Sequence, residues 1–158
     1  MPTKETITII GAGSWQIVAM AKRFAATGNA LLLFSNNENE AAAAQQQLQQ
    51  GFPPASVETL NCPVTASWEA DIIISLLTSV EEKELANKIG EVANQKIVIS
   101  FADPSGNLAD LLPHSKVVYA RREKERQPGE QKDHFIFNSA DADAVKTASE
   151  LFSEQENK

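Results

Sequence analysis

The 158-residue sequence has a single cysteine, Cys62, and only two histidines, His114 and His134. One cysteine cannot form an internal disulfide, and no group of His, Cys, Asp or Glu residues has the spacing of a metal site. The sequence therefore predicts neither a disulfide scaffold nor a metalloprotein. We interpret both histidines as surface or structural residues, and we name no catalytic residue.

Long apolar runs and an excess of positive charge are also missing. The chain has 14 Lys and Arg against 21 Asp and Glu, a net charge of −7, which opposes binding to nucleic acid or anionic membranes. No segment is long and apolar enough for a membrane span or a targeting sequence. We expect a soluble cytoplasmic protein without nucleic-acid or membrane partners. Its length predicts one folded domain, residues 1–153, followed by a polar tail, residues 154–158.

The most informative stretch covers residues 6–16. Its apolar part is short and β-branched, which predicts a strand covered on both faces in a parallel sheet. Gly11 permits a sharp turn after this strand, and Gly13 lets the backbone approach a pyrophosphate without an intervening Cβ. A helix from Ser14 would direct its first free N–H groups and its positive dipole end at that anion. The stretch predicts dinucleotide binding; a glycine turn without a ligand is the alternative.

A second candidate site follows the next expected strand, residues 30–34. Folds that prefer NAD place Asp or Glu about 20 residues after the glycine turn, where the carboxylate binds the ribose 2′-hydroxyl. Here the sequence has Ser35, Asn36 and Asn37, and the first carboxylate is one residue later. Neutral side chains tolerate a 2′-phosphate, so the pattern favours NADP over NAD, although the usual arginine is absent too. The alternative is a turn and helix cap, which Ser and Asn favour.

The remaining chain alternates apolar runs with helix-forming segments. Strands are expected at residues 57–60, 71–77, 96–100, 116–120 and 135–137, and helices at 38–50, after 79 and at 142–152. Pro63 indicates an irregular segment, Trp68 a ring that covers the core, and residues 121–129 a solvated loop. This alternation predicts an α/β fold with a doubly wound, mostly parallel sheet in three α/β/α layers.

A third candidate site is the end of the 71–77 strand, the most apolar one, which we place beside the first strand at the sheet centre. Ligands of open α/β sheets lie outside the carboxyl ends of strands. The residues expected to border the cofactor are therefore Leu76, Leu77 and Thr78. We interpret Ser79 as the N-cap of the next helix. Asp103, in the loop after the 96–100 strand, is either a turn residue or a group near the nicotinamide.

These motifs resemble a known family. Gly11-Ala-Gly-Ser-Trp-Gln, Ser35-Asn-Asn, Ser75-Leu-Leu-Thr and Ala102-Asp-Pro are similar to the NADP-binding domain of deazaflavin-dependent NADP reductases and related dinucleotide-binding reductases. They are more distantly similar to the N-terminal domains of β-hydroxyacid dehydrogenases. The resemblance covers nearly the whole chain in element order and implies a Rossmann fold.

The resemblance also implies roles for individual residues. It assigns the pyrophosphate turn to Gly11, Ala12, Gly13, Ser14, Trp15 and Gln16. It places the adenosine ribose or its phosphate at Ser35, Asn36 and Asn37, and the nicotinamide half at Leu76, Leu77 and Thr78. Asp103 and Pro104 would lie beside the substrate face. The chain departs from the family pattern where Gln16 replaces a third glycine, Asn36 an arginine, and Thr78 a proline.

The activity implied by this resemblance is hydride transfer between NADP(H) and a flavin-like or small carbonyl acceptor. Such transfer requires little beyond placing two rings within reach, because the cofactors carry the chemistry. A homodimer is one way to complete the site, since a helical C-terminal region supplies the catalytic residues of larger relatives. The alternative is a non-catalytic dinucleotide-binding module that senses redox state or serves a partner subunit, because a fold does not establish a function.

Overall fold

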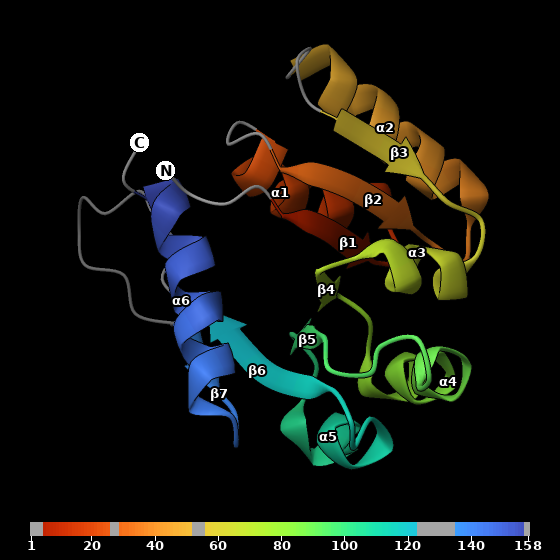
Figure 1. Cartoon of the computed structure of the whole chain (residues 1–158). Coiled ribbons are helices and arrows are strands. Elements are labelled where there is room, and N and C mark those ends of the chain that lie inside the picture. The colour runs from red at the N-terminus through yellow and green to blue at the C-terminus, as the bar shows by residue number, and fades with distance from the viewer. Residues whose placement is uncertain (1–4, 26–28, 52–55, 123–134, 157–158) are drawn as a thin grey trace.

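A single sheet organises the chain. The computed structural model describes residues 5–25, 29–51, 56–122 and 135–156 (Figure 1). Within these ranges, seven strands pair in the order β3-β2-β1-β4-β5-β6-β7, and all neighbours are parallel except β6 and β7. The strands are β1 (Thr6–Ile10), β2 (Ala30–Phe34), β3 (Ser56–Thr59), β4 (Ile72–Ser75), β5 (Ile97–Ser100), β6 (Lys116–Arg122) and β7 (Phe135–Asn138). The predicted doubly wound, mostly parallel sheet is confirmed.

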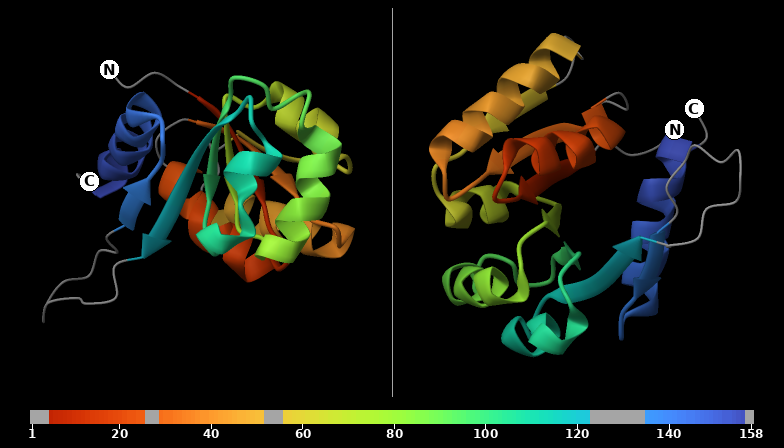
Figure 2. Two further views of the ribbon diagram at one scale, coloured as in Figure 1. Left: turned by 90° about the horizontal axis from the view of Figure 1, so that it is seen from below. Right: turned by 180° about the vertical axis from the view of Figure 1, so that it is seen from behind.

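The helices lie on both faces of this sheet (Figure 2). One face is covered by α1 (Ser14–Ala25), α2 (Glu38–Gly51) and α6 (Ala142–Glu156). The other is covered by α3 (Pro63–Glu69), α4 (Ser79–Ile89) and α5 (Leu108–Leu111), and a 3₁₀ turn, η1 (Pro104–Gly106), precedes α5. The structure thus has the predicted three α/β/α layers.

Strands β1 and β4 are paired at the sheet centre, as predicted, and contribute to both hydrophobic cores. Ile7 and Ile9 pack on the face of α1, whereas Ile10 packs on the face of α4. Ile73 of β4 also faces α4. Side chains of a strand alternate between the two faces, so a strand buried on both needs the continuous apolar run that these segments have.

Two predictions for the segment between β3 and β4 are wrong. Pro63 begins α3 instead of an irregular segment, because a proline at the first helical turn lacks only an N–H that would be unpaired anyway. Trp68 does not cover the core; its side chain is 67% exposed, and its ring lies 5.9 Å from the Lys96 ammonium. Lys96 directly precedes β5, so Trp68 lies at the amino edge of the sheet, opposite the glycine turn.

The N-cap of α4 is Thr78, so the prediction of Ser79 as the cap is wrong. The Thr78 hydroxyl accepts a hydrogen bond from the Glu81 N–H at 3.3 Å, and the Glu81 carboxylate accepts one from the Thr78 N–H at 3.1 Å. This reciprocal pair is a capping box. The glutamate three residues after a threonine is the signal that identifies the cap.

Three predicted boundaries also differ from the structure by two residues or more. The predicted 71–77 strand is β4 and ends at Ser75, so Leu76 and Leu77 follow it. Strand β6 continues to Arg122, so the first two residues of the predicted 121–129 loop are in a strand, and the others lie outside the described ranges, as does His134. Helix α6 continues to Glu156, into the predicted 154–158 tail. Among the described helices, none has the length and apolarity to cross a membrane. The described residues also contain no group of three or more His, Cys, Asp or Glu that could hold a metal.

We expect Thr78→Ala to lower the free energy of unfolding by about 1 kcal/mol, because the first turn of α4 loses its side-chain acceptor. Ser79→Ala removes a hydroxyl one residue later and should change the same quantity by less than about 0.5 kcal/mol. Urea unfolding followed by circular dichroism compares the two variants. Equal losses would contradict the assignment of the cap.

Candidate functional site

The glycine turn between β1 and α1 brings a strand and a helix into close contact. A Cβ atom at Gly11 would lie 2.9 Å from Cγ1 of Ile17, closer than two carbon atoms pack, so only glycine fits. The Gly11 N–H donates to the carbonyl oxygen of Phe34 at 3.1 Å, which joins the turn to the end of β2. Gly11 therefore has a structural role that does not depend on any ligand.

Gly13 differs from Gly11 because its surroundings are open. A Cβ atom there would meet only Cδ1 of Trp15, at 3.9 Å, an ordinary contact distance. The Gly13 carbonyl oxygen accepts the N–H of Ile17 at 3.2 Å, which begins the hydrogen-bonding of α1. The open side of Gly13 thus lies at the amino end of α1, where an anion can reach backbone N–H groups.

A carboxylate from α2 already contacts this helix end. The Ser14 N–H donates to Oε2 of Glu40 at 2.8 Å. The backbone and hydroxyl of Ser14 both hydrogen-bond to this carboxylate and lower the pKa of Glu40. Helix α1 has no acidic residue in its own first turn, so Glu40 supplies the negative charge that its dipole favours. No local pattern in the sequence predicts this contact, because 26 residues separate the partners.

The predicted ribose site after β2 is built as a turn. The Ser35 hydroxyl donates to the carbonyl oxygen of Ala12 at 3.2 Å and accepts the Asn37 N–H at 3.1 Å. The Asn37 side chain accepts the N–H of Asn39 at 3.0 Å, in the first turn of α2. These contacts match the turn-and-cap alternative for Ser35 and Asn37. Asn36 is exposed beside them.

A cavity of about 420 Å³ lies on this side of the glycine turn, between β2, β3 and α2. Its lining residues are Ser35, Glu38, Ala41, Ala42, Thr59, Leu60 and Asn61. The cavity is open to solvent and is adjacent to the turn that Ser35 and Asn37 form. Of the three predicted ribose residues, Ser35 lines this cavity, whereas Asn36 lines a different one together with residues of α4.

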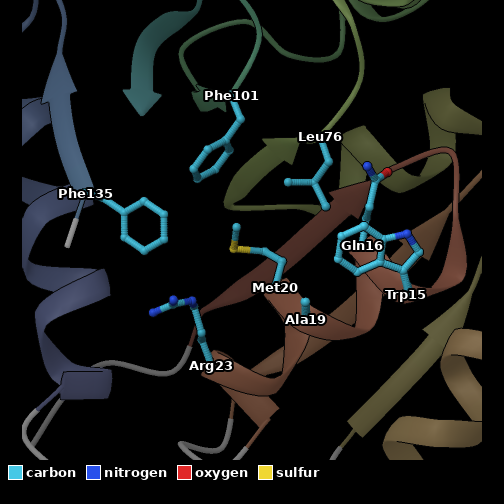
Figure 3. A pocket seen from close by; sticks show the side chains of 8 residues that line it. All are labelled: Trp15, Gln16, Ala19, Met20, Arg23, Leu76, Phe101 and Phe135. Carbon is cyan, nitrogen blue, oxygen red and sulfur yellow. The ribbon is translucent and has the colours of Figure 1, made fainter. Parts of the chain in front are cut away.

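A second cavity, of about 350 Å³, lies on the other side of the glycine turn (Figure 3). Its lining residues are Trp15, Gln16, Ala19, Met20, Arg23, Leu76, Phe101 and Phe135. They come from α1, from the ends of β4 and β5, and from β7. We call this cavity the α1 pocket. Its size is within the usual range for small-molecule sites, and its walls are mainly apolar and aromatic.

Aromatic contacts organise one end of the α1 pocket. The rings of Phe101 and Phe135 meet edge to face with centroids 5.7 Å apart. The guanidinium carbon of Arg23 lies 4.7 Å from the centre of the Phe135 ring, within the range of a cation–π contact. At the other end, Trp15 is 74% exposed at the rim (Figure 3). A flat ring can therefore enter along the exposed indole.

Gln16 lies in the α1 pocket and not between the helix and the strand. Its side chain is exposed, and the contact of α1 with the sheet is made by buried residues such as Ile17, Val18 and Ala21. The replacement of the third glycine therefore does not separate α1 from β1. It places an amide group, which can donate and accept hydrogen bonds, at the pocket wall.

The predicted nicotinamide residues separate in the structure. Leu76 lines the α1 pocket, whereas Leu77 is buried in the core on the opposite face, beneath α4. Thr78 caps α4. Asp103 is exposed, and its carbonyl oxygen accepts the Gly106 N–H at 3.0 Å within the η1 turn. Of these four residues, Leu76 alone lines the α1 pocket.

Five residues that line the α1 pocket are not among those predicted from the sequence: Ala19, Met20, Arg23, Phe101 and Phe135. Those on α1 follow Trp15 and Gln16 at helical spacing, and this periodicity was the available signal. Phe101 directly follows β5, as Leu76 follows β4, so the strand-end argument could have found it. Phe135 could not be found this way, because it enters the site through the antiparallel pairing of β7 with β6.

Comparisons with known proteins agree with this geometry. The family model described as NADP oxidoreductase, coenzyme F420-dependent, matches residues 6–104, which include the glycine turn and the ends of β4 and β5. A search of curated proteins finds no match.

Several solved structures share the fold. A protein of Arthrobacter sp. FB24 assigned as an F420-dependent NADP reductase is 15% identical with a TM-score of 0.75, over 96% of this chain and 81% of that one. A pyrroline-5-carboxylate reductase of Coxiella burnetii is 15% identical with a TM-score of 0.73, over 95% and 56%. A reductive aminase of Aspergillus terreus, solved with NADPH and ethyl levulinate, is 16% identical with a TM-score of 0.72, over 96% and 52%. The chain thus spans little more than half the length of the last two proteins.

We expect Glu40→Gln to lower the stability of the fold at neutral pH but not in strong acid. A carboxylate with a lowered pKa stabilises the fold above its unfolded value, near 4.5, and this contribution is lost as the pH falls through the lower folded value. Glutamine keeps an acceptor oxygen but not the charge. Urea unfolding at pH 7 and at successively lower pH measures the difference from the parent.

Glu150→Gln, at an exposed position of α6, is the matched control and should leave stability unchanged at each pH. A deficit for Glu40→Gln that is constant with pH would show that the carboxylate charge does not stabilise α1.

Proposed function

The chain belongs to the family of coenzyme F420-dependent NADP oxidoreductases, and from this membership we propose that it transfers hydride between NADP(H) and a flavin-like acceptor at the α1 pocket. The observation that carries this proposal is the pair of cavities on the two sides of the glycine turn. This arrangement matches a dinucleotide, in which two nucleosides flank one pyrophosphate. The glycine turn between the cavities is where the pyrophosphate would bind.

Each part of the proposed cofactor has a matching part of the chain. Gly13 leaves room for the pyrophosphate at the amino end of α1. The Ser14 N–H there donates to Glu40 in this structure and would serve the pyrophosphate once that carboxylate is displaced. The cavity beside Ser35 would receive the adenosine. The neutral side chains directly after β2 support NADP over NAD, whereas the Glu38 carboxylate, which lines the same cavity, opposes a 2′-phosphate.

The α1 pocket would receive the acceptor next to the nicotinamide. When bound, the nicotinamide supplies or accepts the hydride. Leu76 and Phe101 would exclude water from the reacting rings, and Trp15 would cover them from the rim. Arg23 places a positive charge beside Phe135, where it would favour an acceptor with an anionic group.

The lining of the α1 pocket supports a flavin-like acceptor over a small carbonyl. Reduction of a carbonyl produces an alkoxide, which needs a nearby general acid. None of the eight described residues that line the pocket has a side chain that titrates near neutral pH. A flavin-like ring spreads the charge it gains and can take its proton from water, so apolar walls suffice.

The contact between Glu40 and Ser14 favours a second candidate, a dinucleotide-binding module without turnover. The Glu40 carboxylate uses an N–H that a pyrophosphate would otherwise use. A cofactor must displace it, which weakens binding. A weakly bound cofactor suits a protein that responds to the concentration of the dinucleotide.

We expect NADPH to quench tryptophan emission and to bind more tightly than NADH. The change should disappear in Trp15→Phe, because Trp15 lies at the pocket rim, and persist in Trp68→Phe, because Trp68 lies at the opposite edge of the sheet. Oxidation of NADPH with flavin and deazaflavin acceptors then separates the reductase from the module. Absence of binding of either nucleotide at millimolar concentration to the folded protein would refute both.

We expect Gly13→Asp to weaken NADPH binding at least about 100-fold while the fold persists, because it places a second anion at the pyrophosphate position. The fold should tolerate the change, since a Cβ atom at Gly13 meets no atom closer than 3.9 Å. Gly51→Asp adds the same charge at the end of α2, where a Cβ atom has nothing within 4 Å, and should leave binding unchanged. Isothermal titration compares the variants. Unchanged affinity in Gly13→Asp would remove the pyrophosphate from this turn.

A further inference from the structure

A buried carboxylate lies behind the α1 pocket, on the opposite face of the sheet. Glu82 of α4 is 3% exposed, and its Oε2 accepts a hydrogen bond from the Ser100 hydroxyl at 2.7 Å. Burial raises the pKa of Glu82, and hydrogen bonds from the Ser75 and Ser100 hydroxyls oppose that rise. Burying this carboxylate costs free energy, since an apolar side chain of the same size would avoid its desolvation.

The two serines occupy equivalent positions. Ser75 ends β4 and Ser100 ends β5, and the two residues are paired in register. Each serine oxygen also accepts an N–H from the loop that follows its strand. The Leu77 N–H donates to Ser75 Oγ at 3.4 Å, and the Ala102 N–H donates to Ser100 Oγ at 3.1 Å. Because each hydroxyl gives its hydrogen to Glu82, its lone pairs are directed at the loop.

These two loops supply one wall of the α1 pocket. Leu76 lies between Ser75 and Leu77, and Phe101 lies between Ser100 and Ala102, so each pocket residue is flanked by two residues of this network. The Phe101 N–H also donates to the carbonyl oxygen of Ser75 at 3.1 Å, which joins the two loops. A shift of either serine would therefore move a pocket side chain.

We propose that Glu82 is a positioning residue, which fixes the loops after β4 and β5 through Ser75 and Ser100 and thereby sets the distance between Leu76 and Phe101 in the α1 pocket. The effect on ligands rests on the proposed function of that pocket; the effect on the loops does not. Glu82 touches no ligand in this scheme. It acts from the α4 side of the sheet on residues that face α1.

The chemistry of the network explains why a carboxylate is needed. A carboxylate accepts both hydroxyl hydrogens and presents no donor of its own. A glutamine at this position accepts one of them and directs an NH₂ group at the other serine. A methionine has nearly the same length and accepts neither. Comparing glutamate, glutamine and methionine at this position therefore distinguishes the effect of hydrogen bonding from that of packing.

The experiment compares Glu82→Gln and Glu82→Met with the parent by amide hydrogen exchange. In Glu82→Met, the Leu77 and Ala102 amides should exchange roughly tenfold faster, as for the loss of one hydrogen bond each. The overall stability at pH 7 should fall, because the buried Ser75 and Ser100 hydroxyls lose their acceptor, so exchange at these two amides is compared with exchange at other amides of the sheet. Glu82→Gln should give intermediate exchange. Glu84→Gln, at an exposed position of α4, is the matched control and should change neither amide.

Ligand binding provides the second measurement. The dissociation constant for NADPH should rise at least about fivefold in Glu82→Met, whereas that for adenosine 2′,5′-bisphosphate, which lacks the nicotinamide half, should not change. Partial rescue by Glu82→Gln would separate positioning from packing. An equal loss for both ligands would overturn the proposal, because it would show general damage to the site.

Two further outcomes distinguish the effect of Glu82 on the loops from its effect on ligand binding. Unchanged exchange at Leu77 and Ala102 in Glu82→Met overturns the proposal whatever the ligand does. If the parent binds no dinucleotide, the proposed function fails, and faster exchange at these amides still supports the positioning role. Should Glu82→Met not fold, Ser75→Ala and Ser100→Ala replace it. Ser75→Ala should speed exchange at the Leu77 amide alone, and Ser100→Ala at the Ala102 amide alone.

Discussion

The contact between the glycine turn and the first helix is the constraint on which the rest of the structure depends. β1 lies beside β4 at the sheet centre, and α1 can follow it directly only because Gly11 has no Cβ atom to meet Ile17 at 2.9 Å. This close packing aims the amino end of α1 along the carboxyl edge of the sheet. It also fixes the side of α1 on which Trp15 and Arg23 line a pocket. A bulkier turn would change the position of every one of these groups together.

The parts of the fold that the sequence predicts are those that local pattern determines. Short β-branched runs give the strands and their central pairing, and Gly11 with Gly13 gives the strand–turn–helix unit. The wrong predictions concern residue types that occur in two structural contexts. Pro63 breaks a helix interior but also begins a helix, and Thr78 and Ser79 are both capping residues, which only the position of Glu81 distinguishes.

The parts of the candidate site that the sequence does not predict depend on distant contacts. Glu40 reaches Ser14 across 26 residues, and Glu82 reaches Ser100 across 18. Both glutamates read as ordinary residues in the first turns of helices. Phe135 reaches the pocket only because β7 reverses against β6. No period or spacing within one segment encodes such contacts, whereas Trp15, Gln16 and Leu76 followed from their places after strands.

These distant contacts decide where the binding free energy of a dinucleotide would arise. The chain carries a charge of −7, and the amino end of α1 is already paired with a carboxylate. A pyrophosphate would therefore exchange one anion for another and gain less than in an unpaired helix end. The remaining affinity would come from burial of the two nucleosides in the cavities proposed for them. On the proposed function, dinucleotide binding would thus depend on the shape of the α1 pocket, and so on Ser75, Ser100 and the carboxylate behind them.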